Sequence, residues 1–320
     1  MSLMSTALAP PPGGQVSERR GWPASRRRSG WRPKVLHFLA FAAPGLAAYL
    51  LFVLLPIGMS VRTSFTNRSL VNNPGQWVGL RNYSNLFSDA DFTQALKNTI
   101  VITVIITVVA NAAGLAIAML LDRRGKLFNA MRAVFFTPVI LSGVVVSVIW
   151  RAILSDDGLL DSMLRSLGVK HPPGWLSDPN IALYSVTFIL TWQILGFCVV
   201  VFLAGLQGVP AELMEAAELD GAGRAARFRN VTWPMLAPAL TINTVMLLIS
   251  GFKVYDQIQV MTNGGPGNGT TSTIAFDVVQ TTFTGNHIGY GAAMAVVMLV
   301  IIASVSVVTL RFLQRREITL

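Results

Sequence analysis

The sequence predicts an all-α membrane protein with six transmembrane helices and both termini in the cytoplasm. Three observations predict this fold class. Only 12% of the 320 residues are charged and 52% are hydrophobic, whereas a soluble domain carries about 25% charged residues. The charges are clustered and leave six long apolar gaps between them. When these gaps are taken as spans, most basic residues fall on one side of the membrane, as is usual for the cytoplasmic side.

Each gap can hold a transmembrane helix, which needs about 20 residues. The gaps are residues 35–61, 98–121, 133–150, 179–211, 230–252 and 278–310. We expect the helices at about 37–59, 96–121, 133–153, 183–206, 236–255 and 289–312. Residues 101–109 are apolar on every face, which favours helices over the alternating strands of a membrane barrel. Residues 257–276 are also free of charge, but their Gly, Thr and Asn content predicts a loop.

Lysine and arginine set the orientation of the spans. With the N-terminus inside, the cytoplasmic segments carry seventeen of the 25 basic and seven of the 15 acidic residues, which accounts for the whole net charge of +10. The charge is therefore a topology signal, and we expect no nucleic-acid partner. Residues 1–34 are predicted to be a disordered basic cytoplasmic tail near membrane lipid. Residues 35–314 are predicted to form the six-helix transmembrane domain, which contains a cytoplasmic loop at 207–235, and residues 315–320 a second cytoplasmic tail.

Nothing in the sequence indicates catalysis or metal binding. The single cysteine, Cys198, lies inside the fourth gap, and His37, His171 and His287 are far apart in the predicted topology. The chain has no G-x-x-x-x-G-K-[ST] phosphate loop, so it is not expected to hold ATP itself. We expect neither an enzyme nor a cofactor-binding chain.

The polar segment 207–235, between the fourth and fifth gaps, is the most informative part of the chain. It contains Glu215-Ala-Ala-Glu-Leu-Asp-Gly221 and reaches Pro234 just before the next span. Acidic residues stabilise the first turns of a helix, alanine favours helix, and glycine favours a turn. The segment is therefore predicted to form a short helix, a glycine turn and a second short helix at the cytoplasmic surface.

This spacing resembles the EAA loop of binding-protein-dependent ABC importer permeases. Further segments are similar to carbohydrate-importer permeases, namely residues 78–83, 191–196, 203–213, 252–258 and 262–268. The Gly-Gly-Pro element within 262–268 resembles permeases of the MalF type in particular. Together they cover most of the chain from the first span onward. Val231 and Trp233 stand where Ile and Leu are usual in the family, and both remain apolar.

The resemblance implies a type I ABC importer permease in the bacterial inner membrane. A separate ATPase would then be coupled through the EAA loop, at Glu215, Ala216, Ala217, Asp220, Gly221 and Pro234. The expected partners are a second, MalG-type permease, an extracytoplasmic solute-binding protein, and two ABC ATPase subunits that bind ATP and Mg. The expected substrate is a carbohydrate.

Six residues are candidates for the substrate path: Trp192, Gln193, Asn243, Lys253, Tyr255 and Asp256. Lys253 and Asp256 are three residues apart in the expected fifth helix and could pair on one face. Polar residues in spans also hold helices together, so for each candidate both interpretations stay open.

The alternative function is a stand-alone secondary transporter of a small polar solute driven by an ion gradient. Such a carrier requires ionisable residues deep in its spans, and this chain has almost none. We therefore expect a permease subunit that forms the path for a sugar or related polyol.

Overall fold

The computed structural model describes residues 41–267 and 269–315. All regular secondary structure in this part is helical, and one isolated antiparallel bridge joins Thr66 to Trp77. The chain divides into two units, residues 1–55 and 56–320. The expected tail over residues 1–34 lies outside the described residues, as does the second tail beyond Arg315.

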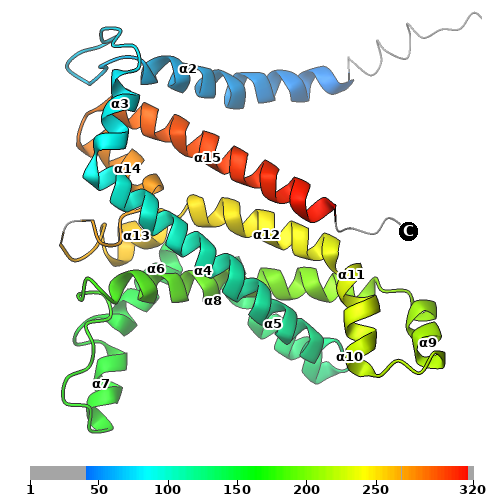
Figure 1. Cartoon of the computed structure of the whole chain (residues 1–320). Helices are drawn as coiled ribbons and strands as arrows, with labels where there is room; N and C mark the ends of the chain where they lie inside the picture. The colour runs from blue at the N-terminus through cyan, green and yellow to red at the C-terminus, as the bar shows by residue number, and fades with distance from the viewer. Residues whose placement is uncertain (1–40, 268, 316–320) are drawn as a thin grey trace, which may run out of the picture. The chain divides into compact units, whose positions relative to one another are not determined.

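Four helices are long and apolar enough to cross a membrane (Figure 1). They are Phe41–Ser64, which joins the π-helical turn η1 (Leu50–Leu54) to α2 (Leu55–Ser64), then α4 (Ala90–Leu121), α8 (Ala182–Gln207) and α15 (Ile288–Gln314). The shortest has 24 residues, about 36 Å at 1.5 Å per residue, and so exceeds a hydrocarbon core of about 30 Å. These helices correspond to the first, second, fourth and sixth expected spans.

The third span is broken, and the expectation of one continuous helix over 133–153 was wrong. It consists of α5 (Lys126–Ile140) and α6 (Gly143–Leu154). Leu141 and Ser142 between them have extended backbone, with ψ of 141° and 147°. The Ser142 hydroxyl accepts a hydrogen bond from the Val145 N–H, which starts a new helix at this point.

The fifth span is also bent and ends earlier than expected. The segment Arg224–Met235, made of α10 (Arg224–Arg227), η2 (Phe228–Thr232) and α11 (Trp233–Met235), meets α12 (Ala237–Phe252) at 60°. The helix stops at Phe252, and a new helix, α13, covers Asp256–Met261. With each bent pair counted as one span, the described residues contain up to six.

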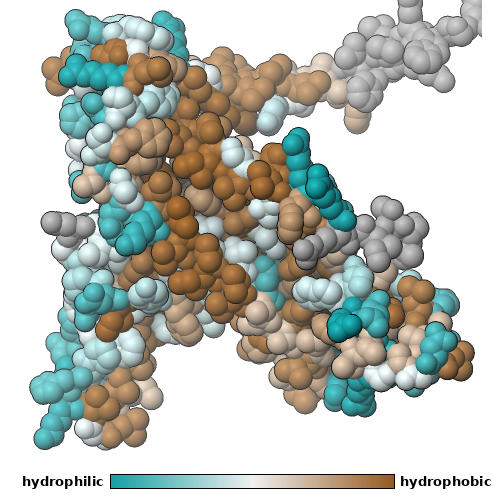
Figure 2. All heavy atoms as spheres, in the orientation of Figure 1, coloured by the Kyte–Doolittle hydropathy of each residue, from teal (hydrophilic) through white to brown (hydrophobic). Residues whose placement is uncertain are grey.

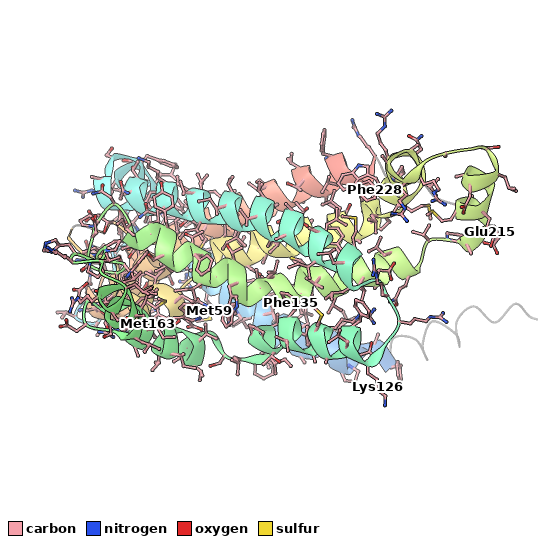
Figure 3. All side chains as sticks on the ribbon, turned by 90° about the horizontal axis from the view of Figure 1, so that it is seen from below. Met59, Lys126, Phe135, Met163, Glu215 and Phe228 are labelled. Carbon is pink, nitrogen blue, oxygen red and sulfur yellow. The ribbon has the colours of Figure 1, made fainter. Side chains whose placement is uncertain are left out.

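The short helices gather at the two ends of the second unit. At one end lie α3 (Arg81–Ser88), α7 (Leu159–Ser166), α13, α14 (Ile274–Val279) and the π-helical turn η3 (Gln280–Thr284), and at the other lies α9 (Ala211–Leu219). Met163 stands at the first end, and Lys126, Glu215 and Phe228 stand at the opposite one (Figure 3). Because the Arg- and Lys-rich connections share the end of Lys126 and Glu215, that end is cytoplasmic.

Small residues allow α8 to pack closely against its neighbours. A Cβ atom on Gly114 of α4 would stand 2.7 Å from the Cys198 Cβ. On Gly196, a Cβ atom would overlap the Phe135 carbonyl oxygen and lie 2.9 Å from the Phe136 Cα of α5. These two glycines set the distance between α4, α8 and α5, and Cys198 is a fully buried member of that contact.

One asparagine fixes the glycine-rich outer loop that precedes α14. The Asn98 amide of α4 donates to the backbone carbonyls of Gly269, Thr270 and Ser272, at 3.1, 3.1 and 2.9 Å. Asn263 and Gly264 have φ of +50° and +92°, so the segment cannot continue α13. The loop expected over 257–276 is therefore interrupted by α13 at its start and by α14 at its end.

Hydrophobic side chains cover the visible side of α4, and hydrophilic ones gather around α9 and α10 (Figure 2). On α4, Val104, Val108 and Leu120 are 53%, 62% and 69% exposed. Such an apolar surface on a soluble chain would favour aggregation, whereas lipid chains cover it without a loss of polar contacts. The fold therefore has the surface of a protein embedded in a membrane.

We expect Gly196→Ala to destabilise the helix packing, because the added methyl group meets backbone atoms of α5 that cannot rotate away. Overpacking of this kind costs roughly 1–3 kcal/mol, and thermal unfolding of the purified chain in detergent measures it. Gly58→Ala is the matched control, since a Cβ atom there meets no described atom within 4 Å. Equal melting temperatures for the two variants would contradict this account of the contact between α5 and α8.

Candidate functional site

The segment 207–235 forms an exposed helix followed by a turn. Helix α9 begins at Ala211, and Pro210, with an extended ψ of 132°, is its N-cap. No residue of α9 is buried. Glu215 and Ala216 are exposed and Ala217 is half-buried, so the face that carries them is open for contact.

Gly221 ends α9 in a left-handed conformation. Its φ is +74°, its N–H donates to the Glu218 carbonyl at 3.0 Å, and the Ala222 N–H donates to the Ala217 carbonyl at 2.9 Å. This pair of bonds is the Schellman arrangement, in which glycine is favoured because other residues are strained at positive φ. A Cβ atom at Gly221 would meet nothing within 4 Å, so the backbone conformation, and not space within the chain, requires glycine.

Few contacts connect α9 to the helical segment after the turn. The Arg227 guanidinium contacts the Glu218 carboxylate at 2.8 Å, and the Thr232 hydroxyl lies 3.9 Å from the Met214 sulfur. Pro234 lies in α11, away from the exposed face of α9, and lines an apolar hollow with Trp233 and Leu240. Glu215, Ala216, Ala217, Asp220 and Gly221 thus lie together on one exposed segment, and Pro234 belongs to the base of the next span.

A cavity of about 290 Å³ lies where the helix breaks of the third and fifth spans meet α8. Its lining includes three of the six candidate path residues, Gln193, Lys253 and Asp256, and also Gln257 and Ser250. The apolar part of the wall comes from Ile106, Val139, Leu190, Ile194 and Val254. A mostly apolar wall with a few convergent polar groups is the usual character of a small-molecule site.

Two glutamines connect the elements around this cavity. The Gln193 amide of α8 donates to the Leu141 carbonyl at 3.1 Å, and its oxygen accepts from the Gln257 amide of α13 at 3.0 Å. A Cβ atom on Gly143 would stand 2.8 Å from the Gln257 amide nitrogen. The break between α5 and α6 is therefore where Gln193 and Gln257 meet, and glycine at 143 leaves room for them.

Lys253 and Asp256 do not pair as expected from a shared helix. Lys253 is the C-cap of α12, and Asp256 is the first residue of α13. Within the described residues, no ion pair joins their side chains. Both side chains instead line the cavity.

The other three candidate residues pack elsewhere. The Trp192 ring meets the Trp150 ring edge-on at 5.5 Å, and the Asn243 amide, fully buried, donates to the Cys198 carbonyl at 3.4 Å. Tyr255 donates to the Gln259 amide oxygen at 3.3 Å, and its ring centroid is 6.3 Å from that of Phe276. Asn243 thus connects α12 to α8, with its side-chain oxygen buried and without a hydrogen-bond partner among the described residues, and Trp192 and Tyr255 lie in aromatic pairs.

Sequence reasoning did not select Ser250 or Gly143 for the cavity. Both stand beside helix breaks that the expected continuous spans did not include, although Ser142 is a residue type that favours the start of a new helix. Among the described residues, no group of three His, Cys, Asp or Glu side chains could hold a metal ion.

The comparisons with known proteins agree with this geometry. Residues 110–318 match the family model described as "Binding-protein-dependent transport system inner membrane component". A probable starch degradation products transport system permease, AmyD of Thermoanaerobacterium thermosulfurigenes, is 34% identical over 87% of this chain and 94% of its own length. The sulfoquinovosyl glycerol permease SmoG of Agrobacterium fabrum is 32% identical over 86% of this chain and 89% of its own length.

A solved structure has the same fold. It is that of a bacterial ABC transporter involved in the import of the acidic polysaccharide alginate, with a TM-score of 0.75, 20% identity, and coverage of 88% of this chain and 96% of the other. At this identity the likeness concerns the fold. The chain belongs to the family of binding-protein-dependent transport system inner membrane components, and it is therefore a permease subunit of an ABC importer in the inner membrane and not an enzyme.

Proposed function

We propose that this permease carries a carbohydrate or related polyol, and that α9 transmits ATP-driven motion to it. The exposed helix α9 with its Gly221 turn carries the proposal. It presents Glu215, Ala216 and Gly221 on the cytoplasmic side, and few contacts connect it to the rest of the chain. A helix that is open on one face and ends in a fixed turn is suited to sit in a groove of another subunit.

The partners follow from what the chain lacks and from its relatives. ATP and Mg would be bound by two ABC ATPase subunits, since the sequence has no phosphate loop. A second, MalG-type permease would complete the path. An alginate transporter of the same fold has been solved with a periplasmic protein that holds an alginate pentasaccharide, which supports an extracytoplasmic solute-binding protein as the donor of substrate.

The substrate class rests on the relatives and on the cavity. Relatives named for sugar uptake include the multiple sugar-binding permease MsmF of Streptococcus mutans, which is 33% identical over 85% of this chain. Asp256 offers a carboxylate and Gln257 its amide oxygen to hydroxyls, and Lys253 adds a donor. Such a set suits a hydroxyl-rich solute better than an apolar one.

We expect Gly221→Trp to abolish uptake and substrate-stimulated ATP hydrolysis in the assembled importer, while the amount of permease in the membrane stays unchanged. A Cβ atom there meets nothing within 4 Å, but tryptophan is strained at this positive φ, so the variant would disturb the turn and crowd a docked subunit while the membrane spans still fold. Gly221→Asn is the control, because asparagine tolerates positive φ at small volume. Normal uptake by the tryptophan variant would rule out docking at this turn.

We expect Asp256→Asn to weaken transport, because a charged partner for a solute hydroxyl is lost while the shape of the cavity is kept. A hydrogen bond to a charged group contributes about 1.5–3 kcal/mol, or roughly a 10- to 150-fold change in apparent affinity. Uptake of labelled sugar supplied on the binding protein measures it. Tyr255→Phe, outside the cavity wall, should retain uptake; equal losses in both variants would argue against this cavity as the path.

A further inference from the structure

The outer helix α7 has an apolar stripe that the chain leaves uncovered. Leu159, Met163 and Leu167 follow one another at four-residue intervals, so they lie on one side of the helix. Their exposed fractions are 62%, 55% and 78%. Asp161, Ser162 and Arg165 lie on the other side, and Ser166 borders the stripe next to Leu159. The helix is thus strongly two-sided.

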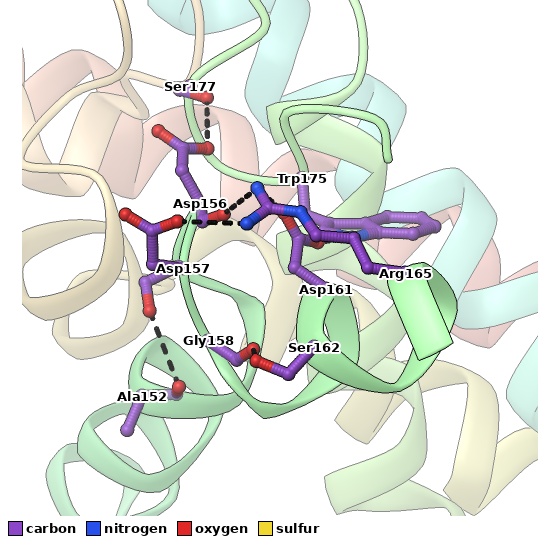
Figure 4. Close-up of polar contacts among 10 residues, drawn as sticks. Ala152, Asp156, Asp157, Gly158, Asp161, Ser162, Arg165, Trp175 and Ser177 are labelled. Atoms are coloured by element: carbon purple, nitrogen blue, oxygen red, sulfur yellow. Dashed lines mark hydrogen bonds and ion pairs between the residues drawn. The ribbon is translucent and has the colours of Figure 1, made fainter. Parts of the chain in front are cut away.

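The orientation of this stripe is fixed by a polar cluster beneath α7 (Figure 4). Asp161, 3% exposed, accepts a hydrogen bond from the Trp175 indole N–H at 3.0 Å. Arg165 approaches Asp161 at 3.9 Å and Asp157 at 3.2 Å, and also donates to the Asp156 carbonyl at 3.2 Å. Because these contacts prevent α7 from turning, the stripe stays on the outside of the chain.

The position of α7 indicates the medium that covers the stripe. Only residues 155–158 separate α7 from α6, whose Val145, Val148 and Ile149 are 47%, 55% and 49% exposed in a membrane span. Helix α7 therefore starts where a span with exposed apolar side chains ends, at the end of the protein opposite Lys126 and Glu215 (Figure 3). Its axis runs across the direction of α8 and α12 (Figure 1).

The hydrophobic surface over α7 lies on the side turned toward the spans, and the hydrophilic surface lies on the side turned away from them (Figure 2). A soluble partner would approach from the outer aqueous side and would meet the hydrophilic surface first. The apolar stripe is directed instead to the region that the hydrocarbon of the outer leaflet occupies.

We propose that α7 is an interfacial helix, with Leu159, Met163 and Leu167 inserted among the lipids of the outer leaflet. Helices of this kind lie in the plane of the interface with the apolar side about 5–10 Å into the boundary of headgroups and acyl chains. In this arrangement, α7 holds the outer end of the broken third span at a constant depth. The proposal depends on the membrane location and not on how ATP hydrolysis is coupled.

Site-directed spin labelling of the assembled importer in lipid vesicles tests this placement. In a Cys198→Ala background, which removes the single cysteine, labels are attached at Met163→Cys and Leu167→Cys, and at Ser162→Cys as the control on the polar side. Uptake of substrate checks that each variant is folded. Leu167 is 78% exposed, so a label at this position should not disturb the packing of α7. The Leu167 variant therefore still tests the proposal if the change at Met163 disturbs the helix.

For each spin label, the relaxation caused by oxygen, which concentrates in lipid, is compared with the relaxation caused by a water-soluble nickel chelate. We expect labels at 163 and 167 to favour oxygen, at a depth of about 5–10 Å, and the label at 162 to favour nickel. Equal access of nickel to both sides would overturn the proposal, because the stripe would then face water. Exclusion of both reagents from 163 and 167 would also overturn it and would indicate a protein partner, either the binding protein or the second permease.

Discussion

The hydrogen bond from Gln193 to the Leu141 carbonyl is the contact on which the interior of this permease depends. Within a bilayer no water replaces a lost helical partner, so a backbone group freed by a helix break needs a donor from the protein. Gln193 supplies that donor across 3.1 Å. The break at residues 141–142 can therefore persist inside a span, and it opens the corner where α13 and its Gln257 approach.

The same constraint explains why the polar cavity lies at the helix breaks. A continuous helix uses its own N–H and C=O groups and offers a solute only side chains, whereas a break redirects both backbone and side chains toward the interior. Lys253 caps α12 and Asp256 starts α13. Their charges meet the cavity because the chain leaves its helix between them, and a regular turn would have kept both on the face of α12.

The sequence predicted the number of spans and the helix and turn of α9. It did not predict where the spans break or which side of each span faces the cavity. Gaps between charges located the spans, and Gly221 with its neighbouring alanines predicted the helix and turn at α9. Pro138, Ser142 and Gly143 lie near the break after Ile140, and Lys253 and Asp256 follow the one after Phe252. Residues of these types also occur in continuous membrane helices, so none of them by itself located a break. Helix α8 is apolar on all sides, so no periodicity could tell that Gln193 faces the cavity while Trp192 packs on Trp150.

An exposed apolar side chain has a different meaning at each end of this protein. Leu219, at the end of α9, is 90% exposed on the cytoplasmic side. Burial of a leucine side chain contributes about 1.5–3 kcal/mol, and no described part of the chain covers Leu219. Next to the Gly221 turn, a groove on a docked ATPase is the apolar surface that the proposed coupling would supply. At the outer end, lipid is the apolar medium that would cover the exposed stripe of α7, because this helix follows a span after only a short connection.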